Sequence, residues 1–582
     1  MKKVNQQMKA VPRSYGKAFL LLLLVLVAVN WVGQDYYARI DLTSDRRFSL
    51  APESVHILKE LPEDIQITVY LKGDFPAGFK QLQKETKEML DEFAARSSHI
   101  HYRFVNPSAS DDPKQRSLLY RQLMDAGLSP TNLQVKTKNG IKQQIIFPGA
   151  ILKMGHKEMP LGLLESEINI PPAQVINHSI ENLEFRFIHA FQSLTIKQKP
   201  VVAFLQGHGE VHGKAIADIW QSLKVDYQPV LVKIGGNRMA LLDSKPDAKN
   251  GKKILRPRYS VLVVADPDSS FSELDKLAID QYVMYGGKVL WLVDPVVASM
   301  DSIRRSEQTV SIDRKLNLQD QLFTYGVRLN KDLILDLNAA PIPVHTGQVG
   351  NQPQIELLPW YYYPVIIPQS KNPIVKNLNG IRLQFASSLD TIRLKGVKKT
   401  ILLQSSPYTG VEQVPGIISL SILRQKPNPQ FFRGPARAVA VLLEGTFPSD
   451  FNNRLIAGLH NKQLPFRKNS VKTAMIVVSD GDLIRNQLKI PEGYPLPLGF
   501  DQFTQQTYGN KAFVLNAISY LCRGPGLISL RKREIKLRML DKTKIAHQSL
   551  FWQLLNVMGP LVLMMGIGLL FVVIRKKRYG KR

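Results

Sequence analysis

The sequence VVAFLQGHGE, at residues 201–210, decides the fold of the larger part of this chain. Its first five residues are apolar without a break, which is typical of a strand that is covered on both faces. Two later stretches follow the same pattern, because SVLVVA at residues 260–265 and KVLWLV at residues 288–293 each run into Asp-Pro. Helices are expected at residues 214–223 and 272–285, so strand and helix alternate along the chain. Such repeated units predict an α/β fold with a parallel, doubly wound sheet.

Further strands are expected at residues 333–337, 439–443 and 474–478. Residues 341–372 are rich in proline, so we expect an insertion or a long surface loop there. This stretch contains the aromatic run WYYY at residues 360–363, for which a packed loop and a recognition patch are both open interpretations.

Residues 34–196 are predicted to form a separate, thioredoxin-like α/β unit. The apolar pattern predicts the order strand, helix, strand, helix, strand, strand, helix, which is that of the thioredoxin-like fold. These elements are expected at residues 65–71, 79–95, 100–105, 113–126, 133–136, 145–153 and 176–194, with Asn139-Gly140 in the turn between the paired strands. In redox members of that fold a dithiol follows the first strand, whereas residues 72–76 (KGDFP) contain no cysteine. We therefore expect this unit to serve in binding or assembly and not in thiol exchange.

The composition limits the number of domains and the chemistry that the chain can perform. A chain of 582 residues is too long for one ordinary core, and 44% hydrophobic residues are ordinary for a folded protein, so two or three domains are expected. Cys522 is the only cysteine, which excludes an intramolecular disulfide, a cysteine-rich zinc site and dithiol chemistry. The formal net charge of +29 favours acidic partners such as anionic lipid head groups or acidic protein faces. Nucleic acid is not expected as a partner, because no nucleic-acid-binding module can be identified.

The loop after the first strand of the parallel sheet supplies the candidate ligand-binding residues Gly207, His208, Gly209 and Glu210. Doubly wound folds bind ligands at the carboxyl ends of their strands, which is where these residues are expected. A phosphate-binding loop is excluded because His208 stands where that motif requires glycine. A metal site built from His208, Glu210 and His212 lacks a recognisable fourth ligand, so no metal and no cofactor is expected. The plainer alternative is a tight turn in which the glycines let the chain leave the strand.

No catalytic residues are predicted, and we expect that the protein is not an enzyme. The chain contains neither the G-x-S-x-G turn of serine hydrolases nor the H-E-x-x-H motif of metalloproteases. Cys522 lies in AISYLCRG, where it reads as a small apolar residue on a helix. Asp480 and Asp482 follow an expected strand, where carboxylates cap a helix or a turn more often than they bind a cation.

Apolar segments near both ends predict two transmembrane helices that flank these domains. The first segment, at residues 18–33, follows a basic tail and is interpreted as a retained signal anchor, with a cleaved signal peptide as the alternative. The second segment, at residues 550–574, precedes another basic tail. Positive charges at both extremities favour two cytoplasmic termini and a large extracytoplasmic region.

The predicted organisation thus has seven parts. They are a basic tail at 1–17, a span at 18–33, the thioredoxin-like unit at 34–196, the doubly wound domain at 197–530, a basic juxtamembrane segment at 531–549, a span at 550–574 and a basic tail at 575–582. For the juxtamembrane segment, contact with anionic lipid and a solvated charged element are both open.

Several segments resemble the gliding-motility-associated ABC transporter accessory proteins, the GldG family. They are RIDLTSDRRFSL at residues 39–50, LKGDFPAGFKQL at 71–82, VVAFLQGHGE at 201–210, SSLDTI at 387–392, YGNKAFVLNAISYL at 508–521 and LRKREIKLRMLDKTKI at 530–545. Each is modest alone, but their order and the two apolar ends make the resemblance specific, and it covers nearly the whole chain.

The resemblance implies a non-ATPase subunit of an ABC-type complex in the inner membrane of gliding Bacteroidota. It implies a separate multi-span permease and a separate ATPase as partners, beside membrane lipids. It also implies that the central region is related to glutamine-amidotransferase-like domains that have lost their catalytic cysteine, and in agreement no nucleophile occupies the turn directly after residues 201–205. The alternative function is an extracytoplasmic ligand- or glycan-binding receptor of a transporter, and a third is an unrecognised metallohydrolase.

Overall fold

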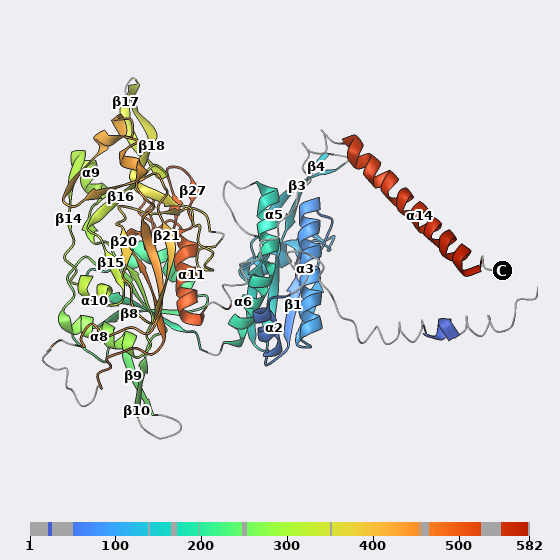
Figure 1. Ribbon diagram of the computed structural model, residues 1–582, viewed down its shortest axis with the longest axis horizontal. Helices are drawn as coiled ribbons and strands as arrows, with labels where there is room; N and C mark the ends of the chain where they lie inside the picture. The colour runs from blue at the N-terminus through green and yellow to red at the C-terminus, as the bar shows by residue number, and fades with distance from the viewer. Residues whose placement is uncertain are drawn as a thin grey trace, which may run out of the picture. The chain divides into compact units, whose positions relative to one another are not determined.

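The computed structural model describes residues 21–25, 50–137, 140–164, 171–196, 198–246, 253–349, 352–376, 378–452, 454, 465–524, 526 and 549–579 (Figure 1). The chain divides into a unit at Phe48–Arg533 and a second unit that joins Met1–Arg47 with Glu534–Arg582. The predicted region at 197–530 and, apart from residues 34–47, the predicted region at 34–196 belong to the first of these units.

A mixed sheet organises the N-terminal region. β1 (Ile65–Val69) pairs in parallel with β2 (Ile100–Phe104) and antiparallel with β5 (Gly149–Met154). β6 (Lys157–Gly162) pairs antiparallel with β5 and completes the order β2-β1-β5-β6. Buried and more exposed residues alternate along β1, which is typical of a strand with one face toward the core.

Helices pack beside this sheet. They are α2 (Pro52–Lys59), α3 (Ala77–Arg96), α4 (Pro113–Asp125), α5 (Pro172–Glu181) and α6 (Leu183–Thr195). α4 begins after Asp112, whose side chain accepts a hydrogen bond from the N–H of Lys114 at 2.9 Å. α3 and α6 meet through Phe93, whose ring centre lies 5.9 Å from that of Phe187 and 5.6 Å from that of Phe191.

Two predicted elements of this region are each split in the structure. The strand expected at 145–153 is divided between β4 (Gly140–Ile146), which pairs with β3 (Thr131–Thr137) in a separate sheet, and β5. Pro148 lies at the division, and a proline has no N–H for a strand ladder. The helix expected at 176–194 is two helices, α5 and α6, which meet at Asn182.

A larger sheet, of order β21-β24-β25-β12-β11-β7-β8, organises the central region (Figure 1). Its parallel strands are β7 (Val201–Gln206), β8 (Gln228–Lys233), β11 (Val261–Ala265), β12 (Val289–Leu292) and β25 (Thr473–Val478). β24 (Ala438–Gly445) and β21 (Val397–Gln404) extend the sheet as antiparallel neighbours. The parallel arrangement of the strands predicted at 201–205, 260–265 and 288–293 is therefore confirmed.

Both faces of this sheet are buried. Val202 and Phe204 belong to one hydrophobic core, and their neighbours Ala203 and Leu205 belong to another. The first core includes residues of α7 (Ala217–Leu223) and α11 (Asn510–Arg523), and the second includes residues of α8 (Glu273–Met284) and of α10 (Gln319–Thr324). The uninterrupted apolar runs of the sequence follow from this burial, because every side chain of such a strand enters one core or the other.

The prediction of a loop at 341–372 is wrong, because most of this stretch is a long β-ribbon. β17 (Ala339–Val349) and β18 (Gln352–Ile366) pair antiparallel, with register shifts between Ala339 and Pro341 and between His345 and Gly347. A proline has no N–H to donate to a strand ladder, which is why the proline content of this stretch points away from strands. The run at 360–363 is buried in a core of its own, so the packed interpretation is confirmed, on a strand instead of a loop.

Smaller elements complete the region. The strands are β9 (Leu242–Pro246), β10 (Lys253–Pro257), β13 (Val296–Val297), β14 (Gln308–Asp313), β15 (Val327–Leu329), β16 (Asp332–Asp336), β19 (Ile381–Arg382), β20 (Leu389–Thr391), β22 (Thr409–Gln413), β23 (Gly416–Ser419), β26 (Phe500–Asp501) and β27 (Gln506–Thr507), and the helices are α9 (Met300–Ser306), η1 (Gly213–Ile216), η2 (Leu420–Arg424), η3 (Phe431–Arg433) and η4 (Asp482–Ile484). The strand predicted at 333–337 is present as β16, but it pairs with β22 outside the large sheet.

α14 (Ser549–Tyr579) forms most of the described part of the second unit. Within the described residues, its segment Phe551–Lys577 is the one helix long and apolar enough to cross a membrane, and it matches the span predicted at 550–574. Of the first predicted span, only residues 21–25 are described, and these are helical. The predicted basic segment at 531–549 lies almost wholly outside the described residues.

The central strand β12 gives a test of the two-sided core. Trp291 is 0% exposed, and we expect Trp291→Ala to lower the free energy of unfolding by about 3–5 kcal/mol because it leaves a cavity. Urea unfolding of the detergent-solubilised full chain, followed by far-UV circular dichroism, measures the loss. Tyr408→Ala is the matched control, since Tyr408 is 62% exposed and its removal should change stability by less than about 0.5 kcal/mol. Equal losses in the two variants would contradict the burial described here.

Candidate functional site

The predicted ligand-binding loop lies at the carboxyl end of β7, and its two ionisable side chains are buried. His208 is 5% exposed and Glu210 is 2% exposed, whereas Gly207 and Gly209 are exposed. Nδ1 of His208 lies 3.1 Å from Oε1 of Glu210, and the backbone N–H of His208 donates to Oε2 at 2.7 Å. On its other side, Nε2 of His208 lies 3.2 Å from Oδ2 of Asp275 in α8. The two predicted side chains therefore contact each other inside the protein.

His208 also fastens this loop to the segment after β11. Its ring stacks on Phe271 with ring centres 3.7 Å apart, and its carbonyl oxygen accepts hydrogen bonds from Asp268 and Ser269 at 2.9 and 3.0 Å. Burial opposes a positive charge on the imidazole, but the two neighbouring carboxylates outweigh burial and raise the pKa of His208 above its ordinary value. These contacts describe a structural residue that joins two strand ends.

The same loop covers the point at which the parallel sheet changes its direction of growth. Along the chain, β8 is added on one side of β7, and β11, β12 and β25 are added on the other. Open α/β sheets bind ligands outside the carboxyl ends of the strands at such a point. Here Gly209 (φ +77°) lies so close to Asp268 that a Cβ would come within 1.6 Å of its carboxylate. What the loop exposes is the backbone of its glycines.

The described residues contain no group of three or more His, Cys, Asp or Glu side chains placed to hold a metal ion. His212, the third member of the metal site weighed from the sequence, has its Nδ1 3.1 Å from the backbone oxygen of Glu210. It therefore does not add a ligand to the pair formed by His208 and Glu210.

Four aspartates lie farther along this edge of the sheet. Asp266 follows β11, Asp294 lies just beyond β12, and Asp480 and Asp482 follow β25. Three of them, Asp266, Asp294 and Asp482, line a cavity of about 480 Å³ that we name the carboxyl-edge pocket. Its other lining residues come from positions 298–301, 314, 341–343, 363, 382, 384–385, 485–488, 490 and 501–503.

Ion pairs neutralise the charge of Asp266, one of the buried carboxylates in this pocket. Asp266 is 2% exposed, and it receives Nη1 of Arg314 at 2.9 Å on one oxygen and Nε of Arg485 at 2.8 Å on the other. Nε of Arg485 also lies 3.0 Å from Asp482. Negative and positive groups are therefore already matched around Asp266.

Burial determines the protonation of the remaining aspartates. It raises the pKa of Asp294 and of Asp480 well above the ordinary range, and the neighbouring carboxylates add to the effect. Burial, followed by the charge of Asp266, raises the pKa of Asp482 to about 6. Asp480 accepts hydrogen bonds from the backbone of Gln384 at 2.7 Å and of Leu483 at 2.9 Å, so its carboxyl holds the turn that follows β25.

Part of this pocket carries a signal in the sequence. Asp266 and Asp294 each stand before a proline directly after an apolar strand, and Asp480 and Asp482 follow another strand. Arg314, Arg382 and the other lining residues carry no motif, and they reach the pocket only through long-range packing. Chemically, the pocket offers guanidinium and amide groups between neutralised carboxyls, which suits the binding of a small polar ligand.

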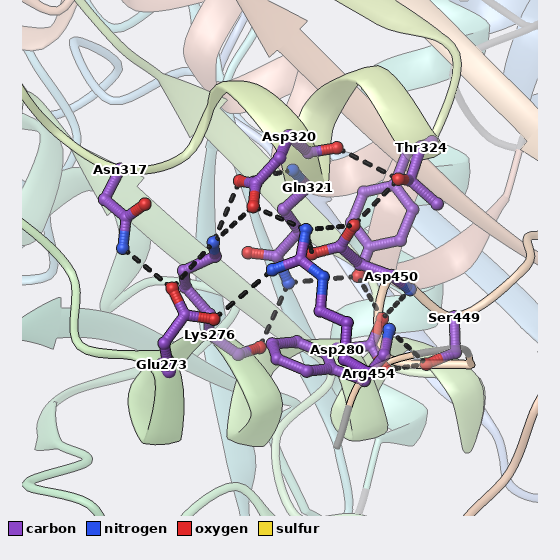
Figure 2. A network of polar contacts seen from close by, with 12 residues as sticks. Glu273, Lys276, Asp280, Asn317, Asp320, Gln321, Thr324, Ser449, Asp450 and Arg454 are labelled. Atoms are coloured by element: carbon purple, nitrogen blue, oxygen red, sulfur yellow. Dashed lines mark hydrogen bonds and ion pairs between the residues drawn. The ribbon is translucent and has the colours of Figure 1, made fainter. Parts of the chain in front are cut away.

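A second polar network joins α8 and α10 with Ser449, Asp450 and Arg454 (Figure 2). Lys276 is 0% exposed, and its Nζ lies 2.8 Å from both carboxylate oxygens of Asp320 and 3.2 Å from Glu273. Arg454 approaches the same two acids, with Nη2 at 2.6 Å from Asp320 and Nη1 at 3.3 Å from Glu273. Figure 2 shows Asp320 between these two cations, so α8 and α10 are held together by charge.

Asp280 forms the buried end of this network. It is 0% exposed and accepts hydrogen bonds from Ser449 at 2.6 Å, Tyr325 at 2.9 Å, the backbone of Asp450 at 3.0 Å and Gln281 at 3.0 Å. Burial raises the pKa of Asp280 to about 6, although these hydrogen bonds act in the opposite direction. The network fixes one wall of an open groove of about 1260 Å³, and its contacts indicate a structural role.

Asp280 yields a prediction about pH. Its carboxyl titrates near 3.8 in the unfolded chain and at about 6 in the fold, so between these values only the native state keeps the proton. Its contribution to stability is present below the lower value and is lost as the pH rises to about 6. The difference between these two pKa values corresponds to about 3 kcal/mol of unfolding free energy. We expect Asp280→Asn, which cannot ionise, to lose less stability than the parent across this interval.

Urea unfolding of the full chain at a series of pH values checks this expectation through the slope of the unfolding free energy. Asp390→Asn is the control, because Asp390 is exposed and its variant should keep the slope of the parent protein. Parallel curves for the parent and Asp280→Asn would show that the buried carboxyl is not the source of the slope.

Comparison with known proteins identifies the family of the central region. Residues 199–517 match a family described as ABC-type uncharacterized transport system, and residues 44–153 match a domain of unknown function. No curated protein matches the chain. Among solved structures, the mmIFT52 N-terminal domain is similar at 12% identity and a TM-score of 0.30, over 56% of this chain and 98% of that chain. The exo-β-1,4-mannosidase Op5Man5 from Opitutaceae bacterium strain TAV5 is similar at 8% identity and a TM-score of 0.17, over 76% of this chain and 51% of that chain.

TM-scores this low carry no argument about the fold. The family match does carry one, because residues 199–517 are more than half of the 582 residues. The chain therefore belongs to the family of ABC-type uncharacterized transport system proteins, which supports an accessory role in an ABC transporter.

Proposed function

We propose that this protein is a non-ATPase, membrane-anchored accessory subunit of an ABC-type transporter complex required for gliding motility. It acts by binding and assembly and not as an enzyme. The observation that carries the proposal is the exposure of α14 in a chain of this family. Large apolar side chains on every side of this helix are exposed, for example Leu563 at 65%, Met564 at 68% and Leu569 at 67%. A helix that is apolar all round requires lipid or other helices around it.

The proposed topology places both termini in the cytoplasm and the domains between the two spans in the periplasm. The last turns of α14 carry the cations Arg575, Lys576 and Lys577 directly after its apolar stretch, and cations collect on the cytoplasmic side of a span. The first span, at residues 18–33, is proposed to be retained as a second anchor in the inner membrane.

The proposed partners in the membrane are a multi-span permease, a separate ATPase and the surrounding lipids. Gly559, Gly566 and Gly568 in α14 have no atom within 4 Å of the position that a Cβ would take. Glycines in a span let the backbone of another helix approach closely. We infer that this glycine-bearing part of α14 is where a permease helix packs.

We also propose folds for the two periplasmic parts. The order β2-β1-β5-β6, with one parallel and two antiparallel pairings, supports a thioredoxin-like unit at residues 34–196. Parallel strands with a core on each face support a doubly wound, glutamine-amidotransferase-like domain at residues 197–530. In both cases the scaffold serves binding, since neither unit has a cysteine in the turn directly after its first strand.

Replacement of the C-terminal span tests the accessory role. In the variant, residues 550–574 are exchanged for an unrelated apolar span of equal length, and the basic tail after it is kept. We expect the variant to insert into membranes but to lose copurification with the permease and the ATPase, because the helix-packing surface is gone. Carbonate extraction checks insertion, and affinity purification from detergent followed by mass spectrometry measures the complex.

A finer variant separates packing from anchoring. Gly566→Leu should weaken the complex, whereas Leu569→Val, which changes an exposed apolar side chain in the same helix, should leave it intact. A complex that persists when the spans at both ends are replaced would rule out assembly through the membrane helices.

A further inference from the structure

The carboxyl-edge pocket contains a guanidinium group that the protein pairs incompletely. Arg382 is 7% exposed and lines the pocket. Its Nη1 lies 3.7 Å from Oδ2 of Asp501, which is longer than a hydrogen bond, and its guanidinium carbon lies 5.5 Å from the ring centre of Tyr508. Asp501 has other partners, since it accepts hydrogen bonds from the N–H of Phe503 at 3.1 Å and from Thr504 at 3.0 Å. The donors of Arg382 thus retain capacity for an additional acceptor.

Two other polar atoms at the pocket are buried without a hydrogen-bond partner. They are Oδ1 of Asn486, a residue that is 7% exposed, and Nε of Arg314. Both residues line the pocket. An unpaired polar atom in a protein interior costs about 1–3 kcal/mol, so such atoms call for a partner that the chain itself does not provide.

Five aspartates and three arginines line the pocket, so the place for an anion depends on which of these groups already have partners. Asp266 is bonded to two arginines, and the carboxyl of Asp294 accepts a hydrogen bond from the N–H of Gly481 at 2.8 Å. Asp482 is 3.0 Å from Arg485. The carboxyls at the pocket therefore have partners of their own, whereas Arg382 has no acceptor at hydrogen-bond distance among the described residues.

The size and walls of the pocket fit a small molecule. A volume of about 480 Å³ lies within the range of about 300–1,000 Å³ that is usual for ligand sites. Tyr363, Phe385 and Phe503 add aromatic surface to the polar groups. A few polar groups between apolar walls are the usual construction of a site that orients its ligand.

We propose that the carboxyl-edge pocket binds a small anionic ligand. The ligand presents a carboxylate or a phosphate to the guanidinium groups of Arg382 and Arg314 and a hydrogen-bond donor to Oδ1 of Asn486. A guanidinium holds either oxyanion through two parallel hydrogen bonds, which explains why an arginine and not a lysine stands at this place. The site goes beyond the accessory role, because it requires a ligand and not a membrane partner.

Binding to the detergent-solubilised full chain tests the proposal, with isothermal titration calorimetry as the measurement. The carboxylate probes are tartrate and galacturonate, the phosphate probes are glycerol 3-phosphate and glucose 6-phosphate, and the neutral controls are erythritol and galactose. We expect at least one charged probe to bind and both neutral controls to fail. The class that binds identifies the oxyanion as a carboxylate or a phosphate.

Two substitutions assign the binding to this pocket. Arg382→Gln should weaken binding about tenfold or more, because it removes a charged hydrogen-bond donor. Asn486→Asp keeps the size of the side chain and adds a negative charge, so it should weaken the binding of an anion by a similar factor. Arg328→Gln, at an exposed arginine of the large groove, is the matched control and should bind as the parent does. Circular dichroism establishes that each variant is folded.

Three results would overturn the proposal: no charged probe binds, a neutral control binds as tightly as its charged counterpart, or Asn486→Asp binds as well as the parent. The last test remains decisive if Arg382→Gln does not fold. Copurification with the permease and the ATPase is measured on the same variants. A variant that loses anion binding but keeps the complex leaves the accessory role untouched. A variant that loses the complex but keeps anion binding counts against the accessory role and leaves the anion site untouched.

Discussion

The burial of the parallel strands on both faces is the constraint on which the central region depends. Adjacent residues of β7, such as Ala203 and Phe204, enter opposite cores, and the same alternation continues through β11, β12 and β25. No face of these strands can carry a charged group without a large desolvation cost. Polar side chains are therefore restricted to the strand ends and to the segments that leave them. Helices such as α8 and α11 exist in this arrangement because each face of the sheet requires a cover.

The carboxyl edge shows the electrostatic consequence of that restriction. Three neighbouring strands, β11, β12 and β25, each deliver aspartates to one place, where four carboxyls would repel one another in a medium that solvates them poorly. The structure reduces the repulsion with guanidinium groups at Asp266 and with raised pKa values at Asp294 and Asp480. The α8–α10 network handles charge in the same way, since Asp320 lies between two cations and Asp280 has a raised pKa.

Local patterns in the sequence predict what local interactions decide. The apolar runs at 201–205, 260–265 and 288–293 predict their strands, and the helix expected at 272–285 is present after Ser272, whose hydroxyl accepts from the N–H of Asp275. The failures lie where distant segments decide. The ribbon of β17 and β18 depends on pairing that proline content obscures. Burial of His208 depends on Asp275, which lies 67 residues away, and most of the carboxyl-edge pocket comes from segments without a motif.

The two candidate binding positions at this edge of the sheet differ in how many of their polar groups lack a partner within the protein. At the change of direction between β7 and β11, His208, Glu210 and Phe271 occupy the interior, and the polar atoms of the loop bond to one another. Toward β12 and β25, the segments that carry Arg314, Arg382 and Asn486 add polar atoms in excess of the partners available to them. An excess of unpaired donors and acceptors is unfavourable for folding alone and is favourable only when something binds. The edge of the sheet thus supplies the general location, and the later segments decide that the opening lies beside β12 and β25 and not at the loop after β7.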